Sequence, residues 1–273
     1  MPAATLSLAD LYLYPVKSLG GFRVTEAEVQ PRGFRHDRRW LIVDARSQFM
    51  TQRTTPEMAL LHLEPAHNGF IIRHTRRPDL LPLLVPFEAQ PDRTQFVTVW
   101  DDMVFTYRGT NEQDQWLTEA LGQPCRLTYM PDVALRPVDG AAVPGLVSFA
   151  DAYPFLLISQ ASLDDLNQRL AQPVPMNRFR PSLVVSGATP YVEDSWHGFQ
   201  IGNTAFEGVK PCARCLVTTT DQHTAERSAE PLRTLSEYRK VGNKVMFGLN
   251  VVGAGSGILR TGDAVQVLTY HNA

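Results

Sequence analysis

Short runs of strand-favouring residues, each broken by Gly, Pro, Asp or Asn, recur along the chain and limit the folds available to it. In the N-terminal part they predict strands over residues 11–14, 24–29, 40–43, 58–63, 70–72, 96–100 and 104–107. Strands of this length with turn residues between them are typical of a small sandwich or barrel. Asp101 and Asp102 stand between two of these runs and predict a tight turn.

Helices are expected to be few. Asn111 can cap a helix that ends at Gly122, and the pattern beginning at Ser162 resembles a capping box and predicts a helix ending at residues 172–173. A third, short helix is expected over residues 231–240, and residues 131–145, rich in Pro, Gly and Ala, predict a long loop. Further strands are predicted over residues 125–129, 153–158, 183–185, 215–219, 245–252 and 264–268.

These elements indicate a mainly β fold with a few helices, in the α+β class. The chain of 273 residues is long enough for two cores, and we expect domains at 1–125 and 126–273. The pairing of the first strand stays open, since it could join either β domain. The glycine-rich run at 253–257 follows a strand, but it lacks the last glycine of a dinucleotide-binding loop and the helix that should follow, so it is interpreted as a strand connection.

Cys212 and Cys215 form a C-x-x-C pair in which each thiol could serve as a soft metal ligand or as a nucleophile. In a thioredoxin-type motif a helix follows, whereas the Val and Thr residues after Cys215 favour a strand, which argues against a dithiol redox site. A structural zinc site needs four N or S ligands. Cys125 is the one other cysteine, and the seven histidines show no paired spacing. Two inert, buried thiols that pack as small hydrophobic side chains are the simplest alternative.

Composition excludes several classes of function. A net charge of −2 gives no electrostatic reason to bind nucleic acid or an anionic membrane. No run reaches the roughly 20 apolar residues of a membrane span, and no export signal is evident at the N-terminus. With three cysteines in the chain, we expect a cytoplasmic protein. Four arginines crowd one short stretch, which is either a solvated face or an anion cradle: Arg32, Arg35, Arg38 and Arg39.

Several segments together resemble a known family. They occupy residues 14–18, 35–44, 149–157, 177–181, 193–196, 212–221, 230–235 and 247–248. Each alone is weak, but their order from end to end resembles the MOSC family, in its two-domain branch. That branch includes the mitochondrial amidoxime-reducing components and bacterial relatives that reduce N-hydroxylated compounds. The resemblance implies an N-terminal β-barrel domain packed on a MOSC-type β-barrel, with a molybdenum–molybdopterin cofactor bound between them.

The resemblance also implies site residues. Cys215 corresponds to the molybdenum ligand and would be the catalytic residue, which suits a soft thiolate. The remaining cofactor-binding positions are Lys17, Ser18, Arg38, Asn177, Arg180, Cys212 and Arg214. Arginine and lysine side chains would bind the cofactor phosphate, and the amide of Asn177 would bind an edge of the pterin.

Neighbouring residues are expected to have structural roles. We expect salt bridges or solvated turns for Arg35 and Arg39, and an orienting role for Asp37 beside Arg38. Residues 194–196, which contain a tryptophan, are interpreted as structural. Ala152 and Tyr153 replace small polar residues of the animal relatives, which leaves open how this loop contacts the cofactor and which substrates fit.

The resemblance implies an oxidoreductase that removes oxygen from nitrogen in N-hydroxy bases, amidoximes or hydroxylamines and releases amines or amidines. The electrons would come from a separate ferredoxin- or flavoprotein-type partner, since the sequence has too few cysteines for an iron–sulfur centre and no nucleotide fingerprint.

Two alternatives remain open. The chain could be a cysteine-persulfide carrier linked to sulfuration of the molybdenum cofactor. The large pyridoxal-phosphate desulfurase domain of the sulfurating relatives is not evident here, which counts against that function. Because those relatives belong to the same family, an association of this chain with pyridoxal phosphate stays open. The last alternative is a non-enzymatic two-domain module with inert thiols.

Overall fold

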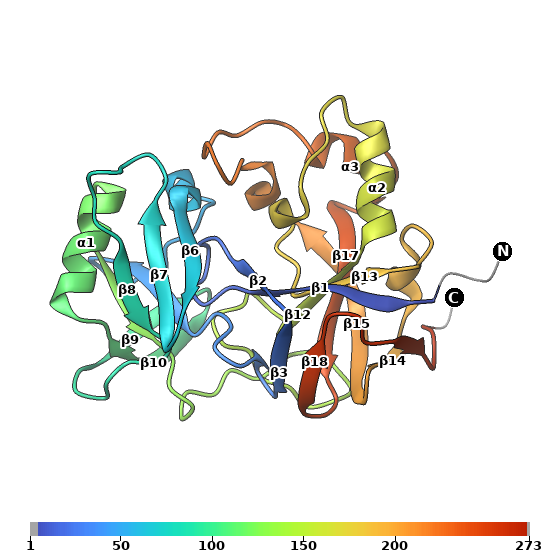
Figure 1. The fold of residues 1–273 in the computed structure, drawn as a ribbon, viewed down its shortest axis with the longest axis horizontal. Helices are drawn as coiled ribbons and strands as arrows, with labels where there is room; N and C mark the ends of the chain where they lie inside the picture. The colour runs from blue at the N-terminus through green and yellow to red at the C-terminus, as the bar shows by residue number, and fades with distance from the viewer. Residues whose placement is uncertain (1–4, 272–273) are drawn as a thin grey trace.

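The computed structural model describes residues 5–271 and has two lobes that lie side by side (Figure 1). The N-terminal lobe, residues 40–129, contains two antiparallel sheets. One has the order β5 (Trp40–Asp44), β11 (Cys125–Tyr129), β10 (Asp102–Arg108), β9 (Thr94–Val99), and the other β6 (Leu61–Ala66), β7 (Gly69–His74), β8 (Leu83–Pro86). A short 3-10 helix (Pro56–Leu60) and α1 (Asn111–Leu121) complete this lobe. Its core includes Trp40, Phe70 and Leu117.

The C-terminal lobe is built on a nine-stranded sheet. Its order is β19 (Val265–Val267), β14 (Gly198–Ile201), β15 (Thr204–Arg214), β17 (Lys244–Gly253), β12 (Phe155–Ser159), β13 (Leu183–Ser186), β1 (Ser7–Leu13), β2 (Phe22–Val24), with β16 (Lys240–Val241) on β17. The pairs are antiparallel except β12 with β13, which α2 (Gln160–Arg169) connects. α3 (Leu232–Tyr238) lies near α2 (Figure 1), and a small sheet joins β18 (Gly257–Arg260), β3 (Glu26–Gln30) and β4 (Gly33–Phe34).

The first strand belongs to the C-terminal lobe, because β1 pairs with β13 and β3 pairs with β18. The chain therefore runs through the larger sheet before it builds the N-terminal lobe. Residues 14–19 lie on the way from one lobe to the other, and Val16 and Leu19 pack in the core of the N-terminal lobe. The division of the sequence at residue 125 stays a proposal. β1 and β3 belong to the first segment, 1–125, but they pair with β13 and β18 of the second.

The α+β class is confirmed, and most predicted strands are present within a residue or two. Residues 24–29 are divided between β2 and β3, and the predicted strand over 58–63 is wrong in its first half, where Pro56 starts a 3-10 helix. The strands β4, β8, β14, β15, β16 and β18 were not predicted. Residues 130–154 contain no helix or named strand, as expected for the long loop. Gly253 to Gly257 connects β17 to β18, as the sequence indicated.

Two predicted helix starts are wrong by a small shift. Thr110, not Asn111, caps α1, because its hydroxyl accepts from the Gln113 amide while the Gln113 side chain accepts from the Thr110 amide. Ser159, not Ser162, caps α2, which ends at Arg169. The predicted end of α1 at Gly122 is confirmed, with φ of 66°. None of the helices in the described part of the chain has the length and apolarity needed to cross a bilayer.

Gly248 in β17 is a position where we expect substitution to destabilise the sheet. Its φ is 79°, and a Cβ there would lie 2.7 Å from Ile158 Cγ1 and 2.9 Å from the Leu157 carbonyl oxygen. We expect Gly248→Ala to lower the free energy of unfolding by about 2 kcal/mol in urea denaturation. Gly242 is the control, with φ of 58° and nothing within 4 Å. Gly242→Ala should cost about 1 kcal/mol, and equal losses would contradict the clash argument.

Candidate functional site

A cavity of about 380 Å³ lies where the segment that joins the lobes meets β15 and the loop before β12. Its lining side chains include seven cations and one carboxylate: Lys17, Arg38, Arg53, Arg180, Lys210, Arg214, Lys244 and Asp151. This concentration of positive charge stands in a chain whose net charge is −2. A cavity of this kind is suited to an anionic ligand, because a buried anion requires cations and hydrogen-bond donors around it.

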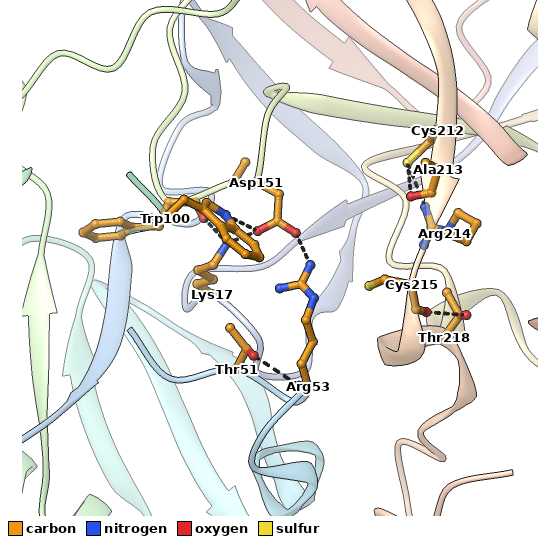
Figure 2. A network of polar contacts seen from close by, with 12 residues as sticks. Lys17, Thr51, Arg53, Trp100, Asp151, Cys212, Ala213, Arg214, Cys215 and Thr218 are labelled. Carbon is orange, nitrogen blue, oxygen red and sulfur yellow. Dashed lines mark hydrogen bonds and ion pairs between the residues drawn. The ribbon is translucent and has the colours of Figure 1, made fainter. Parts of the chain in front are cut away.

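Asp151 forms an ion-pair network at one wall of the cavity (Figure 2). Lys17 donates to its Oδ1 and also to the Phe149 carbonyl oxygen at 2.7 Å, while Arg53 Nη2 donates to its Oδ2 at 2.6 Å. Burial would raise the pKa of Asp151, but the two cations outweigh this effect and hold the pKa below its usual range. Burial lowers the pKa of Lys17, which Asp151 partly offsets. The carboxylate is therefore kept ionised as the partner of a buried lysine.

Arg53 was not predicted from the sequence. It lies on the loop after β5 and in Figure 2 stands between Asp151 and Cys215. Burial would lower the pKa of its guanidinium, but Asp151 and the Cys215 thiol outweigh burial and raise it. The N-terminal half of the chain thus contributes a cation that faces a thiol from the C-terminal lobe. Lys210 and Lys244, on β15 and β17, were also missed, because no motif marks them.

Ser18, Arg38 and Arg180 share an unusual backbone conformation. Their φ angles are 65°, 49° and 55°, in the left-handed region that non-glycine residues adopt at a cost of about 1–3 kcal/mol. All three side chains line the cavity. Backbone strain of this kind gathers at functional sites, where the surrounding structure holds it in place.

Two arginines and a tyrosine form one side of the site. The guanidinium carbons of Arg38 and Arg180 lie 4.4 and 4.5 Å from the centroid of the Tyr14 ring, which is within cation–π range. Arg38 is paired with buried Asp37 and donates to Ser182 Oγ at 3.1 Å, and Arg180 donates to the Leu19 carbonyl oxygen. Burial lowers the pKa of Arg180 to about 10. Asp37 thus orients Arg38, as expected.

Cys212 and Cys215 both line the cavity, but they lie on different kinds of backbone. Cys212 is in β15, two residues before Arg214, whose Nη1 donates to Cys212 Sγ at 3.2 Å and whose Nη2 donates to the Phe179 carbonyl oxygen at 2.6 Å. Cys215 stands just past the end of this strand. Its thiol is partly buried and faces the Arg53 guanidinium, whose pKa it helps to raise.

The strand predicted over 215–219 is wrong, because residues Leu216–Thr219 form a 3-10 helix. The reason is local: Thr218 Oγ1 donates to the Cys215 carbonyl oxygen at 3.0 Å, and Thr219 Oγ1 donates to that of Leu216 at 2.8 Å. Threonine hydroxyls that bond back to the chain stabilise a helical turn despite the β-branched side chain. The argument against a dithiol redox motif therefore rests on β15 instead, which holds Cys212 on extended backbone and not at the start of a helix.

Asn177 is the predicted site residue that the structure places elsewhere. It lines a separate cavity of about 230 Å³, which shares Arg180 with the larger one and is also lined by Tyr14, His62 and His223. Its Oδ1 is buried without a hydrogen-bond partner in residues 5–271. An unpaired buried acceptor is costly and is satisfied when a donor from water or a ligand reaches it.

The remaining arginines of the N-terminal cluster have structural roles. Arg39 donates to the Met130 carbonyl oxygen and pairs with Asp132, and Arg32 donates to the Ala134 and Asp132 carbonyl oxygens. Arg35 pairs with Glu28 at the surface. One member of the cluster, Arg38, reaches the cavity, so the cluster is neither a solvated face nor a joint anion cradle.

The segment after Val192 is also structural, as predicted: Trp196 is buried and Arg239 pairs with Asp194. Within residues 5–271 no three His, Cys, Asp or Glu side chains are grouped to hold a metal ion. A structural zinc site with its full protein ligand set is therefore absent from the described part of the chain.

Comparison with known proteins identifies the family. The family model described as MOSC domain matches residues 144–266, and the model described as MOSC N-terminal beta barrel domain matches residues 5–124. Mitochondrial amidoxime-reducing component 1 of Mus musculus is 33% identical over 96% of this chain and 82% of its own length. Molybdenum cofactor sulfurase of Danio rerio is 33% identical over 90% of this chain, which spans 32% of that relative.

Among solved structures, the YuaD protein of Bacillus subtilis aligns over 98% of this chain and 97% of its own, with 10% identity and a TM-score of 0.45. The sequence relatives connect the chain to molybdenum-cofactor-related function and, through the amidoxime-reducing components, to oxidoreductases. Two family models that together match most of the chain confirm the resemblance found in its motifs. The chain belongs to the MOSC family, in the two-domain branch that joins a MOSC N-terminal beta barrel domain to a MOSC domain.

Proposed function

We propose that this protein is a molybdenum-cofactor-binding oxidoreductase that reduces N-hydroxylated compounds, such as N-hydroxy bases, amidoximes and hydroxylamines, to amines or amidines. The observation that supports it best is the cavity in which seven cations and one carboxylate surround two thiols. A phosphorylated pterin is an anion and molybdenum prefers soft ligands, so this donor set fits the group. The 33% identity to an amidoxime-reducing component favours the same reaction.

In this proposal Cys215 ligates the metal through its thiolate, and Lys17, Ser18, Arg38 and Arg180 bind the phosphate and the pterin. Arg214 holds Cys212 in place by the hydrogen bond that it donates to Sγ. Asn177, in the adjoining cavity, has an unpaired Oδ1 that would accept a hydrogen bond from the pterin. When bound, the cofactor would supply the chemistry that removes oxygen from nitrogen and the electron transfer that accompanies it. The protein would orient the substrate and exclude water from the cavity.

The electron donor is a further part of the proposal. We propose a separate ferredoxin- or flavoprotein-type reductase and a cytoplasmic location. Purified protein should therefore show no turnover with NADPH alone and should turn over when a chemical reductant is added. Turnover with NADPH in the absence of any partner would contradict the need for a donor protein.

The first test is the molybdenum and zinc content per chain, measured by plasma mass spectrometry on protein from a host that makes the cofactor. We expect near-stoichiometric molybdenum and little zinc, with reduction of benzamidoxime by a chemical reductant. As a control for loss of the cofactor during purification, the metal content is also measured on purified protein to which the cofactor has been added back. Absence of molybdenum in both preparations would overturn the proposal.

A cysteine-persulfide carrier is the second candidate. The identity to the molybdenum cofactor sulfurases and the partly exposed thiol of Cys215 favour it. After incubation with a cysteine desulfurase and cysteine, intact-protein mass spectrometry would then show the added mass of one sulfur atom. Loss of this adduct in Cys215→Ser, with no molybdenum bound to the parent protein, would favour the carrier over the reductase.

A further inference from the structure

A second, larger cavity adjoins the candidate cofactor site. Its volume is about 960 Å³, and it lies between the β9–β10 hairpin, residues 133–139 and the end of the same loop just before β12. The two cavities share four lining residues: Asp151, Ala152, Tyr153 and Lys210. A molecule in this chamber, as we call it, would therefore touch the same wall as a molecule in the cofactor cavity. The volume is at the upper end of the range for small-molecule sites.

Exposed apolar side chains are concentrated around the chamber. Of the twelve large hydrophobic residues exposed in residues 5–271, five line it: Phe96, Trp100, Met103, Val133 and Leu135. Exposed hydrophobic residues that are scattered singly need no explanation, but a concentrated set around a cavity marks a binding site. The aromatic members favour a ligand with a flat apolar body.

Trp100 occupies a position that its residue type does not favour. It is the first residue of the two-residue turn between β9 and β10, with φ of 55°, where glycine is preferred. The residue is 46% exposed; its ring is tilted against Phe49, with 4.9 Å between the ring centroids, and the Arg53 guanidinium carbon lies 4.9 Å above its centroid. Its Nε1 donates a long hydrogen bond to Asp151 Oδ1 at 3.4 Å (Figure 2). A strained, half-exposed tryptophan thus connects the chamber to the Asp151 network.

The two cavities have opposite charge. The chamber is lined by four carboxylates and two cations: Asp101, Asp102, Asp139, Asp151, Arg136 and Lys210. Arg136 pairs with Asp102, while neither Asp101 nor Asp139 enters an ion pair within residues 5–271. An anionic group is therefore favoured in the cofactor cavity and disfavoured in the chamber. Neutral or cationic compounds suit the chamber better.

We propose that the chamber binds neutral or cationic compounds with a planar aromatic body, which lie against Trp100 and Phe96 and reach the shared wall with their nitrogen-bearing end. Its role as the substrate site rests on the proposed reductase function, but binding itself does not. Trp100 is then a specificity-determining residue, and Ala152 and Tyr153 form the boundary between bound ligand and cofactor. A smaller side chain at Trp100 should weaken binding, and it also removes the ring under Arg53 and the hydrogen bond to Asp151. Phe96 lines the chamber and not the cofactor cavity, so a substitution there tests the apolar contact alone.

Calorimetry on the full chain, with the cofactor cavity occupied by cofactor or by excess inorganic phosphate, tests the proposal with three ligands of one shape: benzamide, benzamidine and benzoate. We expect the neutral and cationic ligands to bind and benzoate to bind at least about tenfold more weakly, since carboxylates outnumber cations in the chamber. Trp100→Gly should weaken benzamidine binding about tenfold, because a stacked aromatic contact and its buried area are lost. Because glycine suits this position of the turn, the melting temperature of the Trp100→Gly protein should stay close to that of the parent.

Phe96→Ala should also weaken binding, and Leu84→Ala is the matched control, since Leu84 is an exposed apolar residue on β8 outside the chamber. Absence of binding by benzamide and benzamidine, preference for benzoate, or affinities unchanged in both aromatic variants would each overturn the proposal. A chain that binds these ligands as expected but reduces no N-hydroxylated compound would overturn the reductase function alone. A chain that reduces benzamidoxime with a KM unchanged by Trp100→Gly would overturn the chamber alone.

Discussion

Cys215→Ser is expected to abolish turnover while leaving the fold intact. A serine hydroxyl is a hard, weakly acidic donor and a poor substitute for a soft thiolate. Changes in residues that merely support metal ligands cost 10- to 100-fold. We therefore expect activity with benzamidoxime and a chemical reductant to fall by more than about 100-fold. The thiol is partly buried at the end of a strand, so the free energy of unfolding should change by about 0.5 kcal/mol or less.

Cys212→Ser is the matched control, because it changes the same atom three residues away in the same cavity. Serine can still accept the hydrogen bond that Arg214 donates to Cys212 Sγ, so activity should stay within a few-fold of the parent. Molybdenum content should be measured in both variants. Full activity in Cys215→Ser, or loss of molybdenum in Cys212→Ser alone, would contradict the assignment of Cys215 as the ligand.

The strands could be predicted from sequence because their signal is local. The apolar runs that became β12 and β13 are continuous and mostly buried on both sides of the large sheet. The signal failed where a side chain can bond to its own backbone. Residues 216–219 have the composition of a strand, but the hydroxyls of Thr218 and Thr219 stabilise a 3-10 turn. That turn ends β15 at Arg214 and sets Cys215 apart from the sheet.

The candidate site could be predicted only in part. Motif resemblance named Lys17, Arg38, Arg180 and Cys215, and the structure brings them to one cavity, although their roles in cofactor binding stay predictions. Arg53 could not be found in this way, since it pairs with Asp151 across 98 positions of sequence. Local patterns carry no information about such a contact, which depends on how the two lobes meet.

The way the chain crosses between lobes explains why the site is made of distant segments. β1 pairs with strands of the C-terminal lobe, and the residues that follow it pack in the N-terminal core. Lys17 is on this crossing segment and is fixed by packing on both sides. Lys17, Arg38 and Arg180 are therefore held before any ligand arrives, which lowers the cost of ordering them on binding.

Asp151→Asn is expected to cause the largest loss of stability among the changes considered. Lys17 is 5% exposed, and its remaining partner after this substitution is the Phe149 carbonyl oxygen at 2.7 Å. Removing one partner of a buried ion pair costs 3–5 kcal/mol. The Asp151 side chain is 47% exposed, which places the expected loss at the lower limit, about 3 kcal/mol at neutral pH. Urea denaturation of the cofactor-free protein measures it.

The pH dependence of this loss follows from the pKa of Asp151, which Lys17 and Arg53 hold below its usual range against the effect of burial. A carboxyl group with a lowered pKa stabilises the folded state above its unfolded pKa, near 3.9, and this stabilisation disappears as the pH falls through the folded value. The difference between parent and Asp151→Asn should therefore be largest near neutral pH and shrink below about pH 4. Lys17→Met removes the buried charge, so adding Asp151→Asn to it should cost at least about 1 kcal/mol less than in the parent. Additive losses, or a difference between parent and variant that grows in acid, would show that Asp151 does not stabilise the protein through the buried lysine.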